Sequence, residues 1–169
     1  MTADHFAVFG LPRCFHVDTA VLDKCYFDAQ REFHPDRLVG KSAGERQRAI
    51  GRSMLINEAY QLLKSPLERA RHLLALEGIA LDSVKPDKKL LVEIMELRES
   101  LADATGAEAL EKLVAQNENA EEDTLVALAR AFTGLALGDA AQLTMRLSYL
   151  VKLKEEIRIK KKAVSASST

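Results

Sequence analysis

The tripeptide His34-Pro35-Asp36 separates two amphipathic stretches and determines how the first half of the chain is interpreted. Proline lacks an N–H and disfavours the α conformation in the preceding residue, so a helix running toward Phe33 should end there. Upstream, Asp18 is a suitable N-cap. The helix after it carries one apolar stripe, made of Leu22, Tyr26, Ala29 and Phe33. The tripeptide is therefore expected at the tip of a helical hairpin, where an imidazole and a carboxylate favour a contact surface over a core.

A second long helix is expected after the Gly- and Ser-rich residues 40–44. Its apolar face should pack antiparallel against the first stripe and is predicted to contain Ile50, Met54, Asn57, Tyr60 and Leu63. A short helix over Asp4–Phe9 precedes the hairpin. At Pro66 the helical pattern continues, either after a kink or as a new helix capped by Ser65.

The second half of the chain reads as a three-helix bundle. Gly78 ends the first half, and residues 79–87 read as a linker. Helices are expected over 88–105 and over 107–132, the latter with a polar middle that could bend. A last helix, capped by Asp139, carries a stripe of Leu143, Leu147, Leu150 and Ile157. The expected fold is all-α, with domains at 1–78 and 88–169.

Composition excludes several classes of protein. The chain has 169 residues, 47% of them hydrophobic, but no apolar run long enough to span a bilayer. Its net charge of −1 argues against general nucleic-acid binding. The start, Met1-Thr2-Ala3-Asp4, lacks the regions of a signal peptide. Cys14 and Cys25 form neither a disulfide framework nor a zinc motif, which favours a reducing, cytoplasmic setting.

Catalytic and metal-binding motifs are not apparent in the sequence. The histidines are scattered without ligand spacing, and there is no Gly-rich phosphate loop. No nucleophile motif surrounds the Ser or Cys residues. We therefore expect no enzymatic activity, no metal and no cofactor.

Two further motifs accompany the tripeptide. They are Phe6-x-x-Phe9-Gly10-Leu11-Pro12 before the hairpin and Ile56-Asn57-Glu58-Ala59-Tyr60-x-x-Leu63 in its second helix. Together they resemble a J-domain, the module that stimulates the ATPase of DnaK-type chaperones. The segments Arg69–Gly78 and Glu93–Glu99 narrow the resemblance to the HscB-type co-chaperones of iron–sulfur cluster assembly. That resemblance implies an N-terminal J-domain and a C-terminal three-helix domain that bring an IscU-like cluster scaffold to an HscA-like chaperone.

The resemblance implies that His34, Pro35 and Asp36 dock on the nucleotide-binding domain of the chaperone. A basic face of the preceding helix should support them. Lys24 and Arg31 lie opposite the apolar stripe, and Arg37 and Lys41 extend the face beyond the loop. Asp23, Asp28 and Glu32 are interleaved and weaken long-range attraction. For Lys24 and Arg31 alone, a solvated helix face is an equally good interpretation.

The helix after residue 88 indicates a second contact surface. At 100° per residue, Leu90, Ile94, Leu97 and Leu101 form its core face. Leu91, Val92 and Met95 fall on the far side, flanked by Glu96 and Glu99. An apolar patch rimmed by charge is typical of a protein-binding surface, although packing on the J-domain or linker is the alternative. The resemblance assigns this patch to the scaffold protein and adds Tyr149 of the last helix.

The sequence is compatible with two other functions. The chain could be a J-domain adaptor for a different client protein. It could also bind nucleic acid or a membrane surface through the basic end of the last helix, although a solvated helix end is favoured there. The basic residues concerned are Lys152, Lys154, Arg158, Lys160, Lys161 and Lys162.

Overall fold

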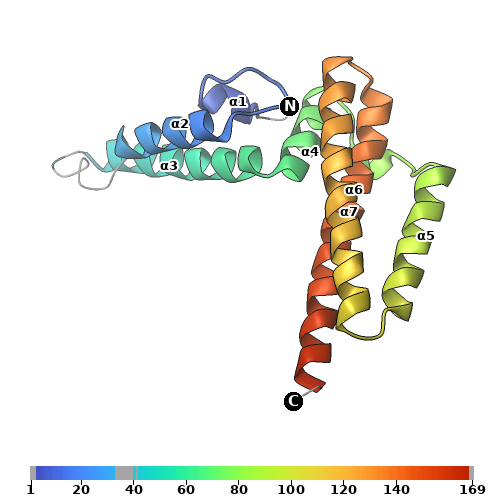
Figure 1. Ribbon diagram of the computed structural model, residues 1–169. Helices are drawn as coiled ribbons and strands as arrows, with labels where there is room; N and C mark the ends of the chain where they lie inside the picture. Colours follow the sequence, from blue (N-terminus) through green and yellow to red (C-terminus); the bar gives the residue numbers. More distant parts are fainter. Residues whose placement is uncertain (1–2, 33–39, 41, 168–169) are drawn as a thin grey trace. The chain divides into compact units, whose positions relative to one another are not determined.

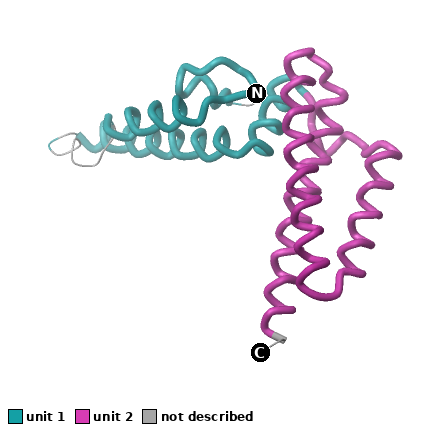
Figure 2. Tube along the Cα trace, in the orientation of Figure 1, with its two compact units in different colours: residues 1–78 teal, residues 79–169 magenta. Residues whose placement is uncertain are grey.

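The computed structural model describes residues 3–32, 40 and 42–167, and these residues form helices and turns without a strand. The predicted all-α fold is confirmed. The chain divides into two compact units, unit 1 over residues 1–78 and unit 2 over residues 79–169 (Figure 2).

Unit 1 contains α1 (His5–Val8), α2 (Thr19–Glu32), α3 (Ala43–Lys64) and α4 (Pro66–Leu76). The long helices α2 and α3 lie side by side and run antiparallel (Figure 1). The predicted caps are present: the Asp18 carboxylate accepts from the amides of Ala20 and Val21. Ser65 ends α3 and caps α4, with Pro66 in the first turn. The chain therefore begins a new helix at Pro66 rather than continuing through a kink.

Polar side chains join α2 to α3. The rings of Tyr26 and Tyr60 stack with centroids 4.0 Å apart. Asn57 Oδ1 accepts from the Tyr26 hydroxyl at 2.9 Å and from Gln30 Nε2 at 2.6 Å. The Tyr60 hydroxyl donates to Asp23 at 2.8 Å, and this hydrogen bond holds the pKa of the Asp23 carboxyl below its ordinary value.

The predicted apolar face of α3 is partly wrong. Ile56, Tyr60 and Leu63 are buried, but the side chains of Ile50 and Met54 are 50% and 66% exposed. The buried face instead continues through the small residue Ala49. Ile50 and Met54 lie on the side of α3 that carries Asn57, where α2 contributes polar contacts rather than an apolar cover.

Two buried histidines attach α1 to α4. The backbone amide of His5 donates to Nε2 of His72 at 3.2 Å, and the two rings lie 4.8 Å apart. Burial lowers the pKa of His72, and the neighbouring His5 lowers it further. Because Nε2 must be unprotonated to accept this bond, α1 is held against α4 by a neutral imidazole.

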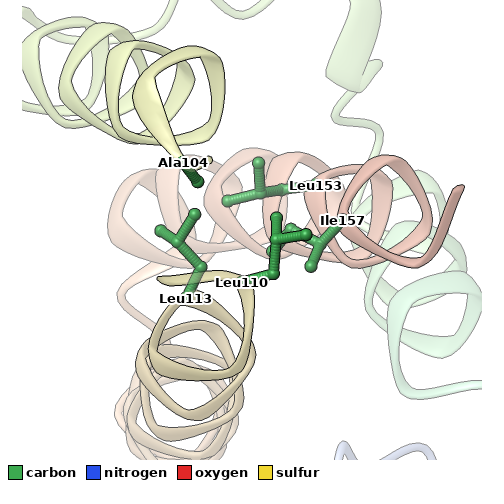
Figure 3. Packing of buried hydrophobic residues seen from close by; sticks show 5 residues of the cluster. All are labelled: Ala104, Leu110, Leu113, Leu153 and Ile157. Carbon is green, nitrogen blue, oxygen red and sulfur yellow. The ribbon is translucent and has the colours of Figure 1, made fainter. Parts of the chain in front are cut away.

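Unit 2 contains a short 3₁₀ turn (Leu81–Ser83) and the helices α5 (Lys88–Asp103), α6 (Ala107–Thr133) and α7 (Leu137–Ser167). Helices α6 and α7 form a long antiparallel pair, and α5 lies beside it (Figure 1). Asp87 caps α5 by accepting from the amide of Leu90 at 2.7 Å. Apolar residues of all three helices meet near the α5–α6 connection (Figure 3). This cluster contains Ala104, Leu110, Leu113, Leu153 and Ile157.

The sequence predictions for α6 and α7 need two corrections. Helix α6 continues through its polar middle, because Asn117 is buried and donates to the carbonyl of Leu150 at 3.2 Å. Helix α7 starts at Leu137, so Asp139 lies in its first turn and is not its N-cap. Leu135 has a φ of 53°, which turns the chain sharply enough for the helix to begin earlier.

Arg146 of α7 connects all three helices of unit 2. Its Nε donates to both carboxylate oxygens of Glu93 on α5 at 2.9 Å. Its Nη1 donates to the hydroxyl of Thr124 on α6. Both members of the Arg146–Glu93 pair are less than one-third exposed, and a bidentate pair of this kind fixes orientation as well as distance.

The His5–His72 contact predicts that unit 1 loses stability in mild acid. The pKa of His72 is lower in the folded chain than its ordinary value of 6.5, so the unfolded chain binds more protons. The stabilisation is complete above pH 6.5 and declines as the pH falls toward the folded pKa. Hydrogen-exchange protection of α1 and α4, corrected for intrinsic exchange, should fall over this range. In His72→Gln, the protection of α1 and α4 should depend less on pH. The control His16→Gln, which changes an exposed residue, should keep the wild-type dependence. An unchanged pH dependence in His72→Gln would refute the role given to His72.

The Arg146 contacts predict that Arg146→Ala loosens α5. Removing the guanidinium leaves the Glu93 carboxylate without its partner, while Thr124 keeps its bond to the Ala120 carbonyl. The free energy of opening of α5 should fall by about 2 kcal/mol. Native-state hydrogen exchange of residues 88–103 measures this quantity. The control is Arg130→Ala, since Arg130 is exposed on α6 and its side chain binds no described residue. Equal protection of α5 in both variants would contradict the role given to Arg146.

Candidate partner-binding surfaces

The tip of the α2–α3 hairpin falls largely outside the described residues. The predicted chaperone-binding residues His34, Pro35, Asp36, Arg37 and Lys41 all lie there. Lys24 and Arg31 are described, and both are exposed on α2. Neither makes an ion pair with a described residue, so both charges face solvent.

The acidic residues interleaved on α2 differ in their surroundings. Asp23 is bound by Tyr60 and lies 3.4 Å from the ammonium of Lys64. Its charge is therefore largely compensated within unit 1. Asp28 and Glu32 are exposed and pair with no described residue, so the described part of the chain presents two cations and two carboxylates of α2 to solvent. A helix of this composition produces a weak long-range field.

Helix α5 has two apolar faces, as its sequence predicts: one is turned toward the core of unit 2 and the other is exposed. Leu90 is buried, and Leu97 and Leu101 pack against the cluster of Figure 3. Leu91 and Val92 are each 46% exposed, and Met95 is 70% exposed. Glu96 and Glu99 are exposed beside them. We call Leu91, Val92, Met95, Glu96 and Glu99 the α5 patch.

Tyr149 lies next to this patch. It is 36% exposed and lines a shallow groove between α5 and α7. Ile94, Leu97 and Arg98 form the α5 wall of the groove, and Tyr149, Lys152 and Glu156 form the α7 wall. None of the patch residues lines this groove. Ile94 follows Leu91 by three residues and Arg98 follows Met95 by three, so helical spacing places the groove along one edge of the patch.

An open hollow of about 1100 Å³ borders the other edge of the patch. Val92, Glu93 and Glu96 line it from α5, and Gln142, Leu143 and Arg146 line it from α7. Sequence reasoning did not identify the α7 residues of this hollow. Arg146 binds Glu93, and the Gln142 side chain binds the backbone of Lys85 and Asp87. These contacts join positions 53 to 57 residues apart and leave no local pattern.

The basic end of α7 binds groups of unit 2. Lys154 pairs with Glu121 at 3.2 Å, and Lys161 pairs with Glu111 at 3.2 Å. Lys160 donates to the carbonyls of Leu101 and Ala102, where it caps the end of α5. These cations therefore hold α5 and α6 to α7, which favours the structural interpretation of the basic run over a nucleic-acid or membrane surface.

No described part of the chain forms a metal site or a membrane span. Among these residues, no group of three His, Cys, Asp or Glu side chains could hold a metal ion. No described helix is both long and apolar enough to cross a bilayer. Cys14 and Cys25 are free thiols, and the buried histidines His5 and His72 serve packing between α1 and α4.

Comparison with known proteins identifies relatives over nearly the whole chain. Residues 86–158 match the family model for the HSCB C-terminal oligomerisation domain. The co-chaperone protein HscB of Proteus mirabilis (strain HI4320) is 34% identical over 161 residues, which cover 91% of this chain and 93% of that protein. The iron–sulfur cluster co-chaperone protein HscB of Mus musculus is also 34% identical, over 95% of this chain and 70% of that protein.

Solved structures agree with these relatives. The chaperone HscB from Vibrio cholerae superimposes with a TM-score of 0.83 at 32% identity, covering 96% of this chain and 99% of that one. The human co-chaperone protein HscB gives a TM-score of 0.87 at 31% identity, covering 95% of this chain and 83% of that one. Identity and coverage at this level confirm the predicted family. The chain therefore belongs to the HscB family of iron–sulfur cluster co-chaperones.

Proposed function

We propose that the chain acts as an adaptor between two proteins. Its N-terminal domain, residues 1–78, stimulates the ATPase of a DnaK-type, HscA-like chaperone. Its C-terminal domain, residues 88–169, holds an IscU-like iron–sulfur scaffold, and residues 79–87 link the two. The observation that carries this proposal is the α5 patch, because α5 buries its opposite face in unit 2 and leaves Leu91, Val92 and Met95 exposed.

On the chaperone side, the proposed contact is the hairpin tip with its flanking cations. His34, Pro35 and Asp36 follow directly after α2, and Lys24 and Arg31 lie on the same helix with their charges exposed. The tip performs no proton transfer. It stimulates hydrolysis by binding more tightly to the chaperone conformation that hydrolyses ATP, since a ligand shifts an equilibrium only by such a difference.

On the scaffold side, the α5 patch and Tyr149 form the proposed contact. The apolar side chains supply area, and Met95 adapts readily to a partner surface. Glu93 is engaged by Arg146, whereas Glu96 and Glu99 face solvent at the edge. Lys88, Lys89 and Arg98 are also exposed about one turn from these apolar side chains. The rim therefore carries both signs of charge and favours a partner whose contact surface is itself mixed in charge.

Joining both contacts in one chain raises the local concentration of scaffold at the chaperone. The protein needs no catalytic group or cofactor for this role, and we place it in the cytoplasm, where free thiols such as Cys14 and Cys25 persist. A J-domain adaptor for another client is the alternative. When this chain is used to capture partners from a cytoplasmic extract, recovery of a cluster scaffold would favour the scaffold adaptor. Recovery of a different client would favour the alternative adaptor.

The proposed docking tip predicts that His34→Gln abolishes ATPase stimulation without unfolding the chain. The change removes the imidazole but preserves the Pro35 helix stop, so helix content should be unchanged. Steady-state ATP turnover of the cognate chaperone measures the effect. His16→Gln, an exposed histidine before α2, serves as the control and should stimulate normally. Full stimulation by the His34→Gln variant would refute the proposed tip.

The α5 patch predicts that Leu91→Ala combined with Met95→Ala weakens scaffold binding at least about tenfold. Each truncation removes exposed apolar area that becomes buried on binding, at roughly 25 cal/mol per Å². Titration calorimetry with the scaffold gives the affinity. Stimulation of the chaperone in the absence of scaffold should stay normal, because unit 1 is unchanged. The control is Val126→Ala, an exposed apolar residue of α6 outside the patch. Equal affinity in the double variant and the control would refute the site.

A further inference from the structure

Phe27 is a large apolar side chain that the fold leaves uncovered. It lies in the middle of α2 and is 60% exposed, although unit 1 buries Phe6 completely and Phe15 almost completely. An exposed aromatic ring contributes little to the stability of the unit that carries it. It does contribute strongly to interfaces, where aromatic residues are enriched among the side chains that dominate binding energy.

Helical geometry places Phe27 on the face that carries the two exposed cations of α2. It follows Lys24 by three residues and precedes Arg31 by four. Residues at these spacings are neighbours on a helix surface. The face therefore consists of one aromatic ring between two cations, rather than of a continuous basic stripe.

The ring of Phe27 contacts a second aromatic ring on α2. It packs at an angle against the ring of Tyr26, with centroids 5.6 Å apart. Tyr26 is itself fixed by stacking on Tyr60 and by its hydrogen bond to Asn57. A ring backed by a rigid neighbour loses little conformational freedom when a partner covers it, which favours binding.

Helix α3 also has exposed apolar side chains on the side that faces Gln30 of α2. Gln30 of α2 donates to Asn57 of α3 across the seam between the helices. Phe27 lies three residues before Gln30, and Met54 lies three residues before Asn57, so they flank this bond one turn to either side. Ile50 lies one turn before Met54 on α3 and is also exposed.

The charges of α2 are too balanced to supply the affinity by themselves. The helix carries two basic and three acidic residues, and Asp23 is engaged by Tyr60 and Lys64. Attraction over distance requires a net local field, which this helix lacks. Short-range contact of an apolar group is then the larger available source of binding energy.

We propose that Phe27 is the apolar anchor of the chaperone-binding face, with Met54 as its extension. This inference rests on the proposed function of the chain. The occupant is the DnaK-type chaperone, through an apolar depression whose rim carries carboxylates. Phe27 fills the depression, and Lys24 and Arg31 pair with the rim. The apolar contact supplies most of the affinity in such a complex, so the affinity varies mainly through the dissociation rate and depends less on salt than that of a purely charged contact.

The test compares two variants of the full chain in ATPase stimulation of the chaperone. Phe27→Ala should raise the concentration that gives half-maximal stimulation by roughly tenfold and leave the maximal rate unchanged. His34→Gln should instead lower the maximal rate, because the tip acts after docking. The control is Val21→Ala, which truncates an exposed apolar residue six positions before Phe27 and about 120° around the helix from it. Stability should change little in either truncation, since both side chains are exposed.

Salt dependence provides a second measurement. The wild-type affinity for the chaperone should fall by less than about threefold between 50 and 200 mM salt, because an apolar contact is not screened. An affinity that falls steeply with salt would overturn the inference. So would a Phe27→Ala variant that behaves like Val21→Ala. In either case the proposed function stands if His34→Gln still loses stimulation. A change in sedimentation of the chain alone on Phe27→Ala, without a change in stimulation, would assign the surface to self-association and also overturn it.

Discussion

One guanidinium group joins the middle of α5 to both other helices of unit 2. Arg146 of α7 binds Glu93 on α5 through both carboxylate oxygens and reaches Thr124 on α6. The apolar cluster of Figure 3 secures the end of α5 near Ala104, whereas Arg146 secures the half that carries the patch. The same contact consumes the charge of Glu93, so the patch keeps Glu96 and Glu99 as its solvent-facing carboxylates. A structural ion pair thus determines which acidic groups a partner meets.

The two units have candidate contact surfaces of similar composition. Each presents apolar side chains that its own core does not need, framed by charges that are not compensated internally. On α5 the exposed apolar group is large, and charges of both signs surround it; on α2 it is mainly Phe27, and the same helix carries two basic and three acidic residues. The two surfaces therefore differ in apolar area more than in the sign of their charge.

Most helices of the fold and the two faces of α5 could be predicted from the sequence. Helix periodicity identified the buried and exposed faces of α5, and cap residues located the start of α2 and α4. The error at Ile50 and Met54 arose because α3 has apolar residues on more than one side, and spacing does not reveal which side meets a neighbour. Leu135 could not be predicted to adopt a positive φ, so the start of α7 was misplaced. The Arg146 contacts were missed because they join distant positions, and Phe27 was missed because it lies outside any stripe.

ATP turnover tests most directly whether this one chain couples a chaperone to its client. The rate of the cognate chaperone is measured alone, with this chain, with the scaffold, and with both. Coupling predicts that both together raise the rate beyond the sum of the separate increases, because the chain presents the scaffold where hydrolysis is triggered. A rate equal to that sum at subsaturating concentrations would contradict the account.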